Sequence, residues 1–111
     1  MENIRNIAIL GSTGSRGRQT LEIIAEYPEK FKAWMLVANN STDLLIEQAL
    51  KVLPHAVVIA NETLYDKVKN ALAHTSIKVY TGSKAIAELV TDPEVDTVVT
   101  AMVGYSGLES T

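Results

Sequence analysis

The chain has 111 residues, of which 47% are hydrophobic and 21% charged, with a formal net charge of −3 and no cysteine. This length suits one domain, and the composition is that of an ordinary globular protein rather than a disordered one. The lack of cysteine excludes a disulfide framework, a thiolate nucleophile and a cysteine-rich zinc site. Lys and Arg are interspersed with Asp and Glu, so nothing predicts binding to nucleic acid or a membrane, and a small-molecule partner is expected.

The amino terminus, Met1–Arg5, lacks the apolar segment of a signal peptide. No apolar run in the chain approaches the length of a membrane span. The absence of cysteine also fits a reducing compartment. We therefore expect a cytoplasmic protein.

The first predicted element is a nearly continuous apolar run, Ile4–Leu10, which is typical of a strand buried on both faces of a parallel sheet. Residues Thr20–Tyr27 follow with helical spacing, and Pro28 ends that segment. Ala33–Ala38 is a second apolar strand. The polar segment Asn39–Asp43 then supplies a turn and a helix cap.

The rest of the chain continues the same alternation. In order, it predicts a helix over Leu44–Leu53, a strand over Ala56–Ala60, a helix capped by Asn61 and running through Leu72, a strand over Ile77–Tyr80, a helix from Gly82–Ser83 through Val90, and a strand over Val95–Val103. Strands that alternate with amphipathic helices are joined by right-handed crossovers. We predict an α/β fold with a doubly wound, Rossmann-like parallel sheet of about five strands and helices on both faces.

A glycine-rich loop, Gly11–Gly17 (GSTGSRG), joins the first predicted strand to the first helix. Glycine lets a backbone turn tightly and approach a phosphate closely. Backbone N–H groups at a helix start point at such an anion, and the hydroxyls of Ser12, Thr13 and Ser15 add donors. We predict that the loop holds the diphosphate of a nicotinamide dinucleotide; the alternative is a purely structural turn.

The spacing of this loop is G-x-x-G-x-x-G rather than G-x-G-x-x-G, a variant with the same mechanics. A P-loop would need Lys followed by Ser or Thr after its last glycine, but Arg18 and Gln19 follow Gly17. Hydrolysis of a nucleoside triphosphate is therefore disfavoured.

The turn after the second strand bears on the choice between NAD and NADP. NAD-specific proteins usually present Asp or Glu to the ribose hydroxyls there, whereas this chain presents Asn39–Ser41. Without an acid nothing repels a 2′-phosphate, which favours NADP, although the turn has no cation. Arg16 and Arg18 are candidates for that charge, and the alternative for each is a solvated residue on the helix surface.

Three stretches carry a family resemblance: IAILGSTGS at residues 7–15, LVANN at 36–40 and TAMVGYSGL at 100–108. With them the chain resembles the amino-terminal part of the 1-deoxy-D-xylulose 5-phosphate reductoisomerases, NADPH-dependent enzymes of non-mevalonate isoprenoid biosynthesis. The resemblance runs over essentially the whole chain. It covers only the first part of such an enzyme.

The resemblance implies a single dinucleotide-binding domain over residues 1–111, with the catalytic and carboxy-terminal domains absent. Such enzymes rearrange and reduce 1-deoxy-D-xylulose 5-phosphate to 2-C-methyl-D-erythritol 4-phosphate, using NADPH and, in the full-length homodimer, a divalent metal (Mg or Mn). Together with the glycine loop, it gives the candidate cofactor-binding residues Gly11, Ser12, Thr13, Gly14, Ser15, Arg16, Gly17, Asn39, Asn40, Ser41, Ala101, Met102 and Gly104. The last three are expected toward the nicotinamide.

The chain departs from the family pattern at three places. Arg16 stands where the family usually has isoleucine, so a long cation either reaches a phosphate or disturbs the loop. Asn39–Ser41 replaces a Gly-Lys/Ser-Asn turn, which removes a lysine that some members direct at the 2′-phosphate. Ser110 stands in the place of a proline.

No residue is assigned as catalytic or as a metal ligand. His55 and His74 lack ligand spacing. The neighbouring acids are better explained by solvation of helix faces and turns than by acid–base catalysis; they are Glu22, Glu26, Asp92, Glu94 and Asp96. Tyr105, just after the fifth strand, is a candidate for contact with cofactor or substrate, and packing is equally compatible with its position.

Three functional hypotheses remain open. The chain is the cofactor-binding part of the reductoisomerase and binds NADPH without turnover, or it is a stand-alone dinucleotide-binding or regulatory module, or Arg16 abolishes binding and the domain is a folding or interaction unit. Because an edge strand of the sheet would be left uncovered, we also expect the fragment to self-associate.

Overall fold

The computed structural model describes residues 4–100. Along the chain, strands and helices alternate as the apolar pattern predicts. The elements are β1 (Arg5–Leu10), α1 (Ser15–Glu26), β2 (Phe31–Ala38), α2 (Thr42–Val52), β3 (Ala56–Ile59), the 3₁₀ helix η1 (Glu62–Leu64), α3 (Tyr65–Ala71), β4 (Lys78–Thr81), α4 (Ser83–Val90) and β5 (Thr97–Thr100).

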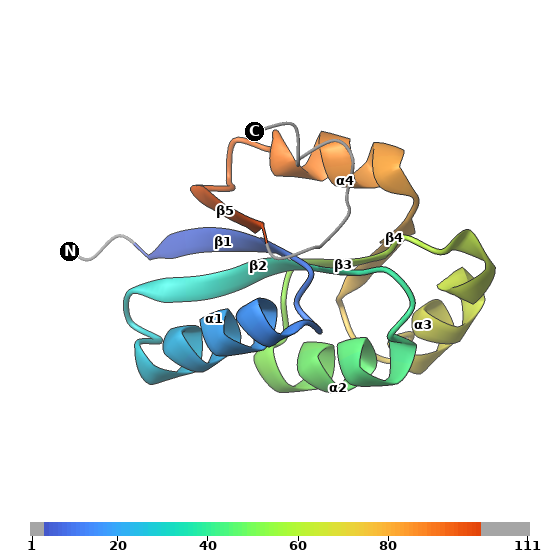
Figure 1. Ribbon diagram of the computed structural model, residues 1–111, viewed down its shortest axis with the longest axis horizontal. Helices are drawn as coiled ribbons and strands as arrows, with labels where there is room; N and C mark the ends of the chain where they lie inside the picture. The colour runs from blue at the N-terminus through green and yellow to red at the C-terminus, as the bar shows by residue number, and fades with distance from the viewer. Residues whose placement is uncertain (1–3, 101–111) are drawn as a thin grey trace.

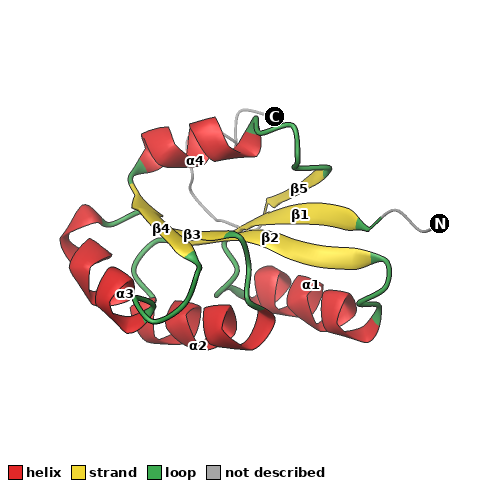
Figure 2. Cartoon of the chain, turned by 180° about the vertical axis from the view of Figure 1, so that it is seen from behind, coloured by secondary structure: helices red, strands yellow, loops and turns green. Residues whose placement is uncertain are grey.

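The five strands form one parallel sheet in the order β4-β3-β2-β1-β5. Helices α1, α2 and α3 cover one face of the sheet and α4 covers the other (Figures 1 and 2). The prediction of a doubly wound α/β fold with helices on both faces is therefore confirmed.

Strand β1 lies at the point where the winding direction of the sheet reverses. From β1 the chain moves outward through β2, β3 and β4, and the α4 connection then returns to place β5 on the other side of β1. In open parallel sheets, ligands bind outside the carboxyl ends of the strands at such a reversal. The loop that follows β1 therefore occupies the expected binding position.

Alternate side chains of β1 pack in two separate hydrophobic cores, one on each face of the sheet. Ile7 and Ile9 pack in the core beneath α1–α3, whereas Ala8 and Leu10 face the core beneath α4. All four are at most 7% exposed. Burial on both faces explains why the strand is continuously apolar.

Strand β2 contains an irregularity at Trp34. Ile7 pairs with Ala33 and the next residue of β1, Ala8, pairs with Met35, so Trp34 is an extra residue in the ladder. Trp34 and Met35 consequently both pack in the core under α4. A bulge of this kind lets two successive side chains share one face.

The bounds of several predicted elements differ in detail, and two of these differences have a visible local cause. The helix expected from Asn61 through Leu72 begins as η1 and continues as α3, with Asn61 Oδ1 accepting a hydrogen bond from the N–H of Thr63 as the predicted cap. Strand β5 begins at Thr97 rather than Val95, because the Val95 N–H donates to the Asp92 carbonyl in a turn. Within residues 4–100, no helix combines the length and apolar character needed to cross a bilayer.

Candidate functional site

The glycine loop is anchored on the end of β2. The backbone N–H groups of Gly11 and Ser12 both donate to the carbonyl of Val37, at 2.8 and 3.0 Å. Gly11 has a φ of 97°, in the region that favours glycine. A tight turn follows, in which the Gly14 N–H donates to the Gly11 carbonyl at 3.2 Å. The loop is thus held directly beside the turn that follows β2.

Gly17 brings helix α1 against this loop. A Cβ at this position would meet the Gly11 carbonyl oxygen and would lie 2.6 Å from Ser12 Cα and 2.8 Å from the Ser12 carbonyl carbon. All three are backbone atoms, which cannot move aside without reshaping the turn. Only glycine permits this approach, as the motif predicts for its last position.

The start of α1 offers backbone donors. Gly14 is the N-cap and makes no side-chain capping bond, and no acidic residue occurs in the first turn. The first intrahelical acceptor is the Gly14 carbonyl, which takes the N–H of Arg18 at 2.9 Å. The N–H groups of the first turn therefore lack intrahelical partners, and with the helix dipole they favour an anion.

The side chains of the loop fall into two groups. Thr13 is half-buried, and Ser15 and Arg16 are exposed at the helix start. Ser12, in contrast, is fully buried, and its hydroxyl has no hydrogen-bond partner among the described residues. Ser12 therefore lies beneath the loop rather than on its outer surface.

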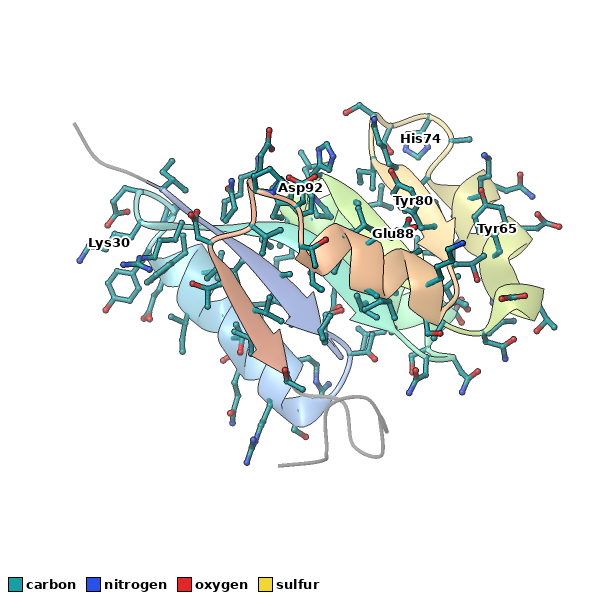
Figure 3. All side chains as sticks on the ribbon, turned by 90° about the horizontal axis from the view of Figure 1, so that it is seen from above. Lys30, Tyr65, His74, Tyr80, Glu88 and Asp92 are labelled. Carbon is teal, nitrogen blue, oxygen red and sulfur yellow. The ribbon has the colours of Figure 1, made fainter. Side chains whose placement is uncertain are left out.

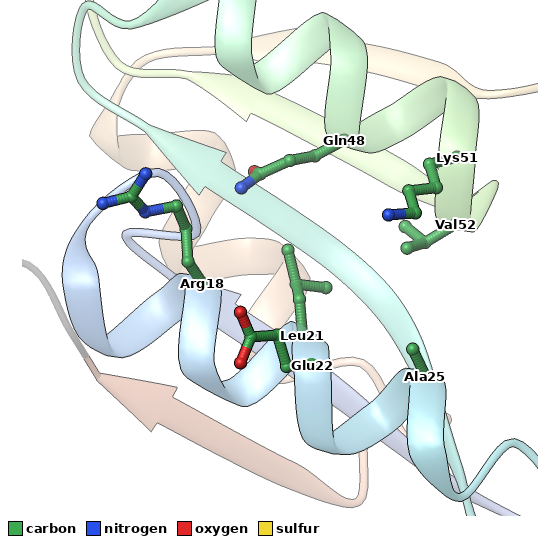
Figure 4. Close-up of a pocket in the computed structure, with 7 residues that line it drawn as sticks. All are labelled: Arg18, Leu21, Glu22, Ala25, Gln48, Lys51 and Val52. Carbon is green, nitrogen blue, oxygen red and sulfur yellow. The ribbon is translucent and has the colours of Figure 1, made fainter.

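The two candidate cations lie differently on α1. Arg16 and Arg18 are both exposed. Arg18 lines a groove between α1 and α2 together with residues of both helices (Figure 4). Arg16 does not line this groove, and the single ion pair found among residues 4–100 joins Lys67 to Asp43 at 3.1 Å. Arg16 thus has no carboxylate partner within the described part of the chain.

A buried residue of α2 supports the loop and was not identified from the sequence. Gln48 Nε2 donates to the carbonyl of Ser12 at 2.9 Å, across 36 positions of sequence. Figure 4 shows the Gln48 side chain extending from α2 toward the loop end of α1. The available signal was its place in the buried stripe of α2 beside Leu45 and Ala49. A polar side chain in a buried stripe requires a hydrogen-bonding partner.

The turn after β2 is exposed and is hydrogen-bonded to Asn61, which follows β3. Its three residues are Asn39, Asn40 and Ser41. The Asn39 carbonyl accepts the N–H of Asn61 at 3.1 Å, and Asn40 Oδ1 accepts Asn61 Nδ2 at 2.7 Å. Ser41, which lies in the segment predicted to supply the cap, occupies the N-cap position of α2, but its side chain makes no capping bond. Asn61 was predicted only as a helix cap, and its link to this turn was not foreseen.

The histidines and acids outside the loop have structural roles or are solvated. His55 stacks on Trp34 with ring centroids 4.6 Å apart, and Glu94 Oε1 accepts the Trp34 indole N–H at 3.3 Å. His74 lies in the turn between α3 and β4 (Figure 3). Within residues 4–100, no three His, Asp or Glu side chains cluster so as to hold a metal ion. Four of the candidate contact residues lie outside the described residues: Ala101, Met102, Gly104 and Tyr105.

Comparison with known sequences gives a consistent family. The family model described as 1-deoxy-D-xylulose 5-phosphate reductoisomerase matches residues 7–111. The chain is 58% identical over 104 residues to the reductoisomerase of Porphyromonas gingivalis strain W83, covering 94% of this chain and 27% of that protein. It is 52% identical over 107 residues to that of Bacteroides fragilis strain YCH46, covering 96% and 28%. The chain thus spans little more than a quarter of these curated relatives.

The solved structures that resemble this chain are also reductoisomerases. A crystal structure of DOX-P reductoisomerase in complex with magnesium superposes with a TM-score of 0.89 and 30% identity, over 96% of this chain and 27% of that one. One in complex with NADPH, fosmidomycin and magnesium gives 0.88 and 31%, over 95% and 26%. The enzyme of Zymomonas mobilis in complex with NADPH gives 0.73 and 32%, over 78% and 23%.

Proposed function

Because the chain belongs to the 1-deoxy-D-xylulose 5-phosphate reductoisomerase family, we propose that its 111 residues bind NADPH for that enzyme's reaction. The reaction is the rearrangement and reduction of 1-deoxy-D-xylulose 5-phosphate to 2-C-methyl-D-erythritol 4-phosphate. NADPH supplies the hydride for the reduction. We expect the 111-residue chain by itself to bind the cofactor without turnover.

The observation that carries this proposal is the geometry of the loop after β1. The Gly17 contact brings the start of α1 against Gly11 and Ser12, and the first helical turn has neither a side-chain cap nor an acidic residue. Free backbone N–H groups at the positive end of a helix match the oxygens of a diphosphate. The loop also follows the strand at which the winding reverses.

The predicted contacts other than Gly11 and the buried Ser12 each have a role in this proposal. Ser15, Arg16 and Gly17 present backbone N–H groups of the first helical turn to the diphosphate, and the Thr13 and Ser15 hydroxyls add donors. Gly14, which lacks a side chain, lets the phosphate approach the backbone closely. Arg16 adds a positive charge beside the diphosphate. The turn Asn39–Ser41 meets the ribose and 2′-phosphate of the adenosine end, and Ala101, Met102 and Gly104 meet the nicotinamide end.

The divalent metal of the proposed reaction does not fit the described residues. No cluster of acidic or histidine ligands occurs between residues 4 and 100. The solved relatives that contain magnesium are longer chains, of which this chain covers 26–27%. We therefore assign no metal-dependent step to residues 4–100.

The first test is calorimetric titration of the purified chain with NADPH and with NADH, beside an Arg16→Ile variant. We expect saturable binding of both with NADPH preferred, and a loss of about fivefold in NADPH affinity for Arg16→Ile, because an exposed ion pair contributes up to about 1 kcal/mol. The loss should shrink as salt is added, since exposed charges are screened.

Arg5→Ile is the matched control, because Arg5 is also exposed but lies at the start of β1, the end remote from the glycine loop. It should leave the affinity unchanged. Absence of binding by the wild-type chain would contradict the proposed function. Binding by Arg16→Ile alone would mean that the fold persists and that Arg16 obstructs the site.

We also propose that the 111-residue chain self-associates through β5. This strand is at the edge of the described sheet, and Val98 on it is 41% exposed. An uncovered strand edge is a template for pairing with another chain. Size-exclusion chromatography over a dilution series should show concentration-dependent dimers or larger species.

Val98→Lys should shift this equilibrium toward the monomer, because a charged residue at a strand edge opposes pairing. Ile23→Lys is the matched control: Ile23 is 51% exposed, but it belongs to helix α1 and not to an edge strand. A wild-type chain that elutes as a monomer at every concentration would contradict self-association.

A further inference from the structure

We infer that Asn61 determines the dinucleotide specificity of the site by orienting Asn40, so that Asn40 presents an uncharged N–H donor to the 2′-phosphate of NADPH. The inference rests on the proposed function and extends it to a residue of β3's carboxyl end, outside the predicted site. It depends on which end of each amide side chain is a donor and which an acceptor.

The orientation of Asn61 follows from Thr63. The backbone N–H of Thr63 lies 3.0 Å from Asn61 Oδ1, and its hydroxyl lies 2.6 Å from the same atom. A backbone N–H can only donate, so the atom that faces it must be the amide oxygen. The amino group of Asn61 is consequently on the opposite side of the amide.

The orientation of Asn40 follows in turn. Asn61 Nδ2 is 2.7 Å from Asn40 Oδ1, and an amide nitrogen can only donate. The oxygen of Asn40 is therefore used by Asn61, and the Asn40 amino group faces away from it. A second bond, from the Asn61 N–H to the Asn39 carbonyl at 3.1 Å, holds the two segments together.

The position of Asn40 gives this orientation a consequence for binding. Asn40 lies just after the carboxyl end of β2, three residues after Val37, whose carbonyl accepts the N–H groups of Gly11 and Ser12 in the glycine loop. Rossmann-type sheets place the adenosine ribose at this point. A phosphate only accepts hydrogen bonds, whereas a ribose hydroxyl both donates and accepts. An outward N–H therefore contributes more to binding NADPH than to binding NADH.

This arrangement also explains how the turn could bind a 2′-phosphate without the lysine that some family members have there. A neutral donor held in one orientation loses less freedom on binding than one that must first be oriented. Hydrogen bonds to a charged acceptor contribute about 1.5–3 kcal/mol. An oriented Asn40 thus supplies phosphate recognition without a cation.

The experiment is a double-mutant cycle in the 111-residue chain with Asn61→Ala, Asn40→Ala and the double variant, titrated with NADPH and NADH. We expect Asn40→Ala to lower NADPH affinity about tenfold, because it loses a bond to a charged acceptor. Asn61→Ala should lower it about threefold, since Asn40 is then free to present either end. In the Asn40→Ala background, Asn61→Ala should have no further effect on NADPH affinity.

NADH affinity should stay within about twofold of wild type in all three variants. Asn70→Ala, an exposed asparagine of α3, is the matched control and should change neither affinity. Thermal unfolding of each variant separates a loss of fold from a loss of orientation.

Equal losses of NADPH and NADH affinity in Asn61→Ala would indicate a merely structural role and overturn the inference. An unchanged NADPH affinity, or an equal loss in the Asn40→Ala background, would also overturn it while leaving the proposed function intact. A wild-type chain that binds neither dinucleotide would overturn both.

Discussion

Gly17→Ala is expected to be the most damaging single substitution in the described part of the loop. The new Cβ would lie 2.6 Å from Ser12 Cα and 2.8 Å from the Ser12 carbonyl carbon, besides meeting the Gly11 carbonyl oxygen. Overpacking costs about 1–3 kcal/mol where side chains can adjust, and we expect about 3 kcal/mol or more here because the opposing atoms are backbone. NADPH binding should be lost, since α1 can no longer approach the loop.

The measurement is urea unfolding followed by the fluorescence of the single tryptophan, together with calorimetric titration. Gly14→Ala is the matched control. Gly14 has φ −80° and ψ 175°, extended backbone that any residue adopts. The unfolding free energy of the Gly14→Ala variant should differ from that of the wild type by no more than about 1 kcal/mol, although the added methyl group weakens cofactor binding. A Gly17→Ala chain as stable as the wild type would contradict the proposed packing.

Gln48→Leu should produce the second largest loss of stability to unfolding. The substitution removes the donor to the Ser12 carbonyl and leaves that acceptor without its partner in a buried position. An unsatisfied buried acceptor costs about 1–3 kcal/mol. Gln48 Oε1 is itself buried without a partner among the described residues, so replacing it removes one unsatisfied atom. This gain offsets part of the loss, and we expect about 1–2 kcal/mol of destabilisation.

Gln19→Leu makes the same chemical change on the exposed face of α1. Surface substitutions usually change stability by less than about 0.5 kcal/mol, so the difference between the two variants isolates the buried bond. NADPH affinity should also fall in Gln48→Leu, because the Ser12 backbone loses its support. If both variants unfolded at the same urea concentration, the Gln48 bond would make no net contribution to stability.

The local sequence pattern was sufficient for most of the fold. Five apolar runs predicted the five strands, and the intervening periodic segments predicted the helices, because burial on two faces or on one stripe leaves a direct trace in composition. The boundaries were less exact. Helix α1 begins at Ser15, several residues before its first apolar residue. Its first turn is polar and follows the extended N-cap at Gly14, so the apolar pattern does not show where the helix starts.

Some features of the candidate site could likewise be predicted from the sequence and others could not. Gly11, Gly14 and Gly17 were identified from spacing and context, and the structure places Gly17 in the close contact that its position requires. Exposure of Ser12 was not predictable, because the same hydroxyl suits a phosphate contact or a buried position beneath the turn. The structure buries it completely. The roles of Arg16 and of the turn Asn39–Ser41 stay predictions.

The sequence by itself determined the type and order of the elements and the position of the glycine loop, because these depend on short-range periodicity and on the backbone freedom of glycine. Only the tertiary structure decided the bulge at Trp34, the bond from Gln48 to the loop, and the orientation of Asn40 by Asn61. The two side-chain bonds join residues 36 and 21 positions apart. They form because packing of α2 and pairing of β2 with β3 bring these residues together, and that juxtaposition leaves no periodic trace in the chain.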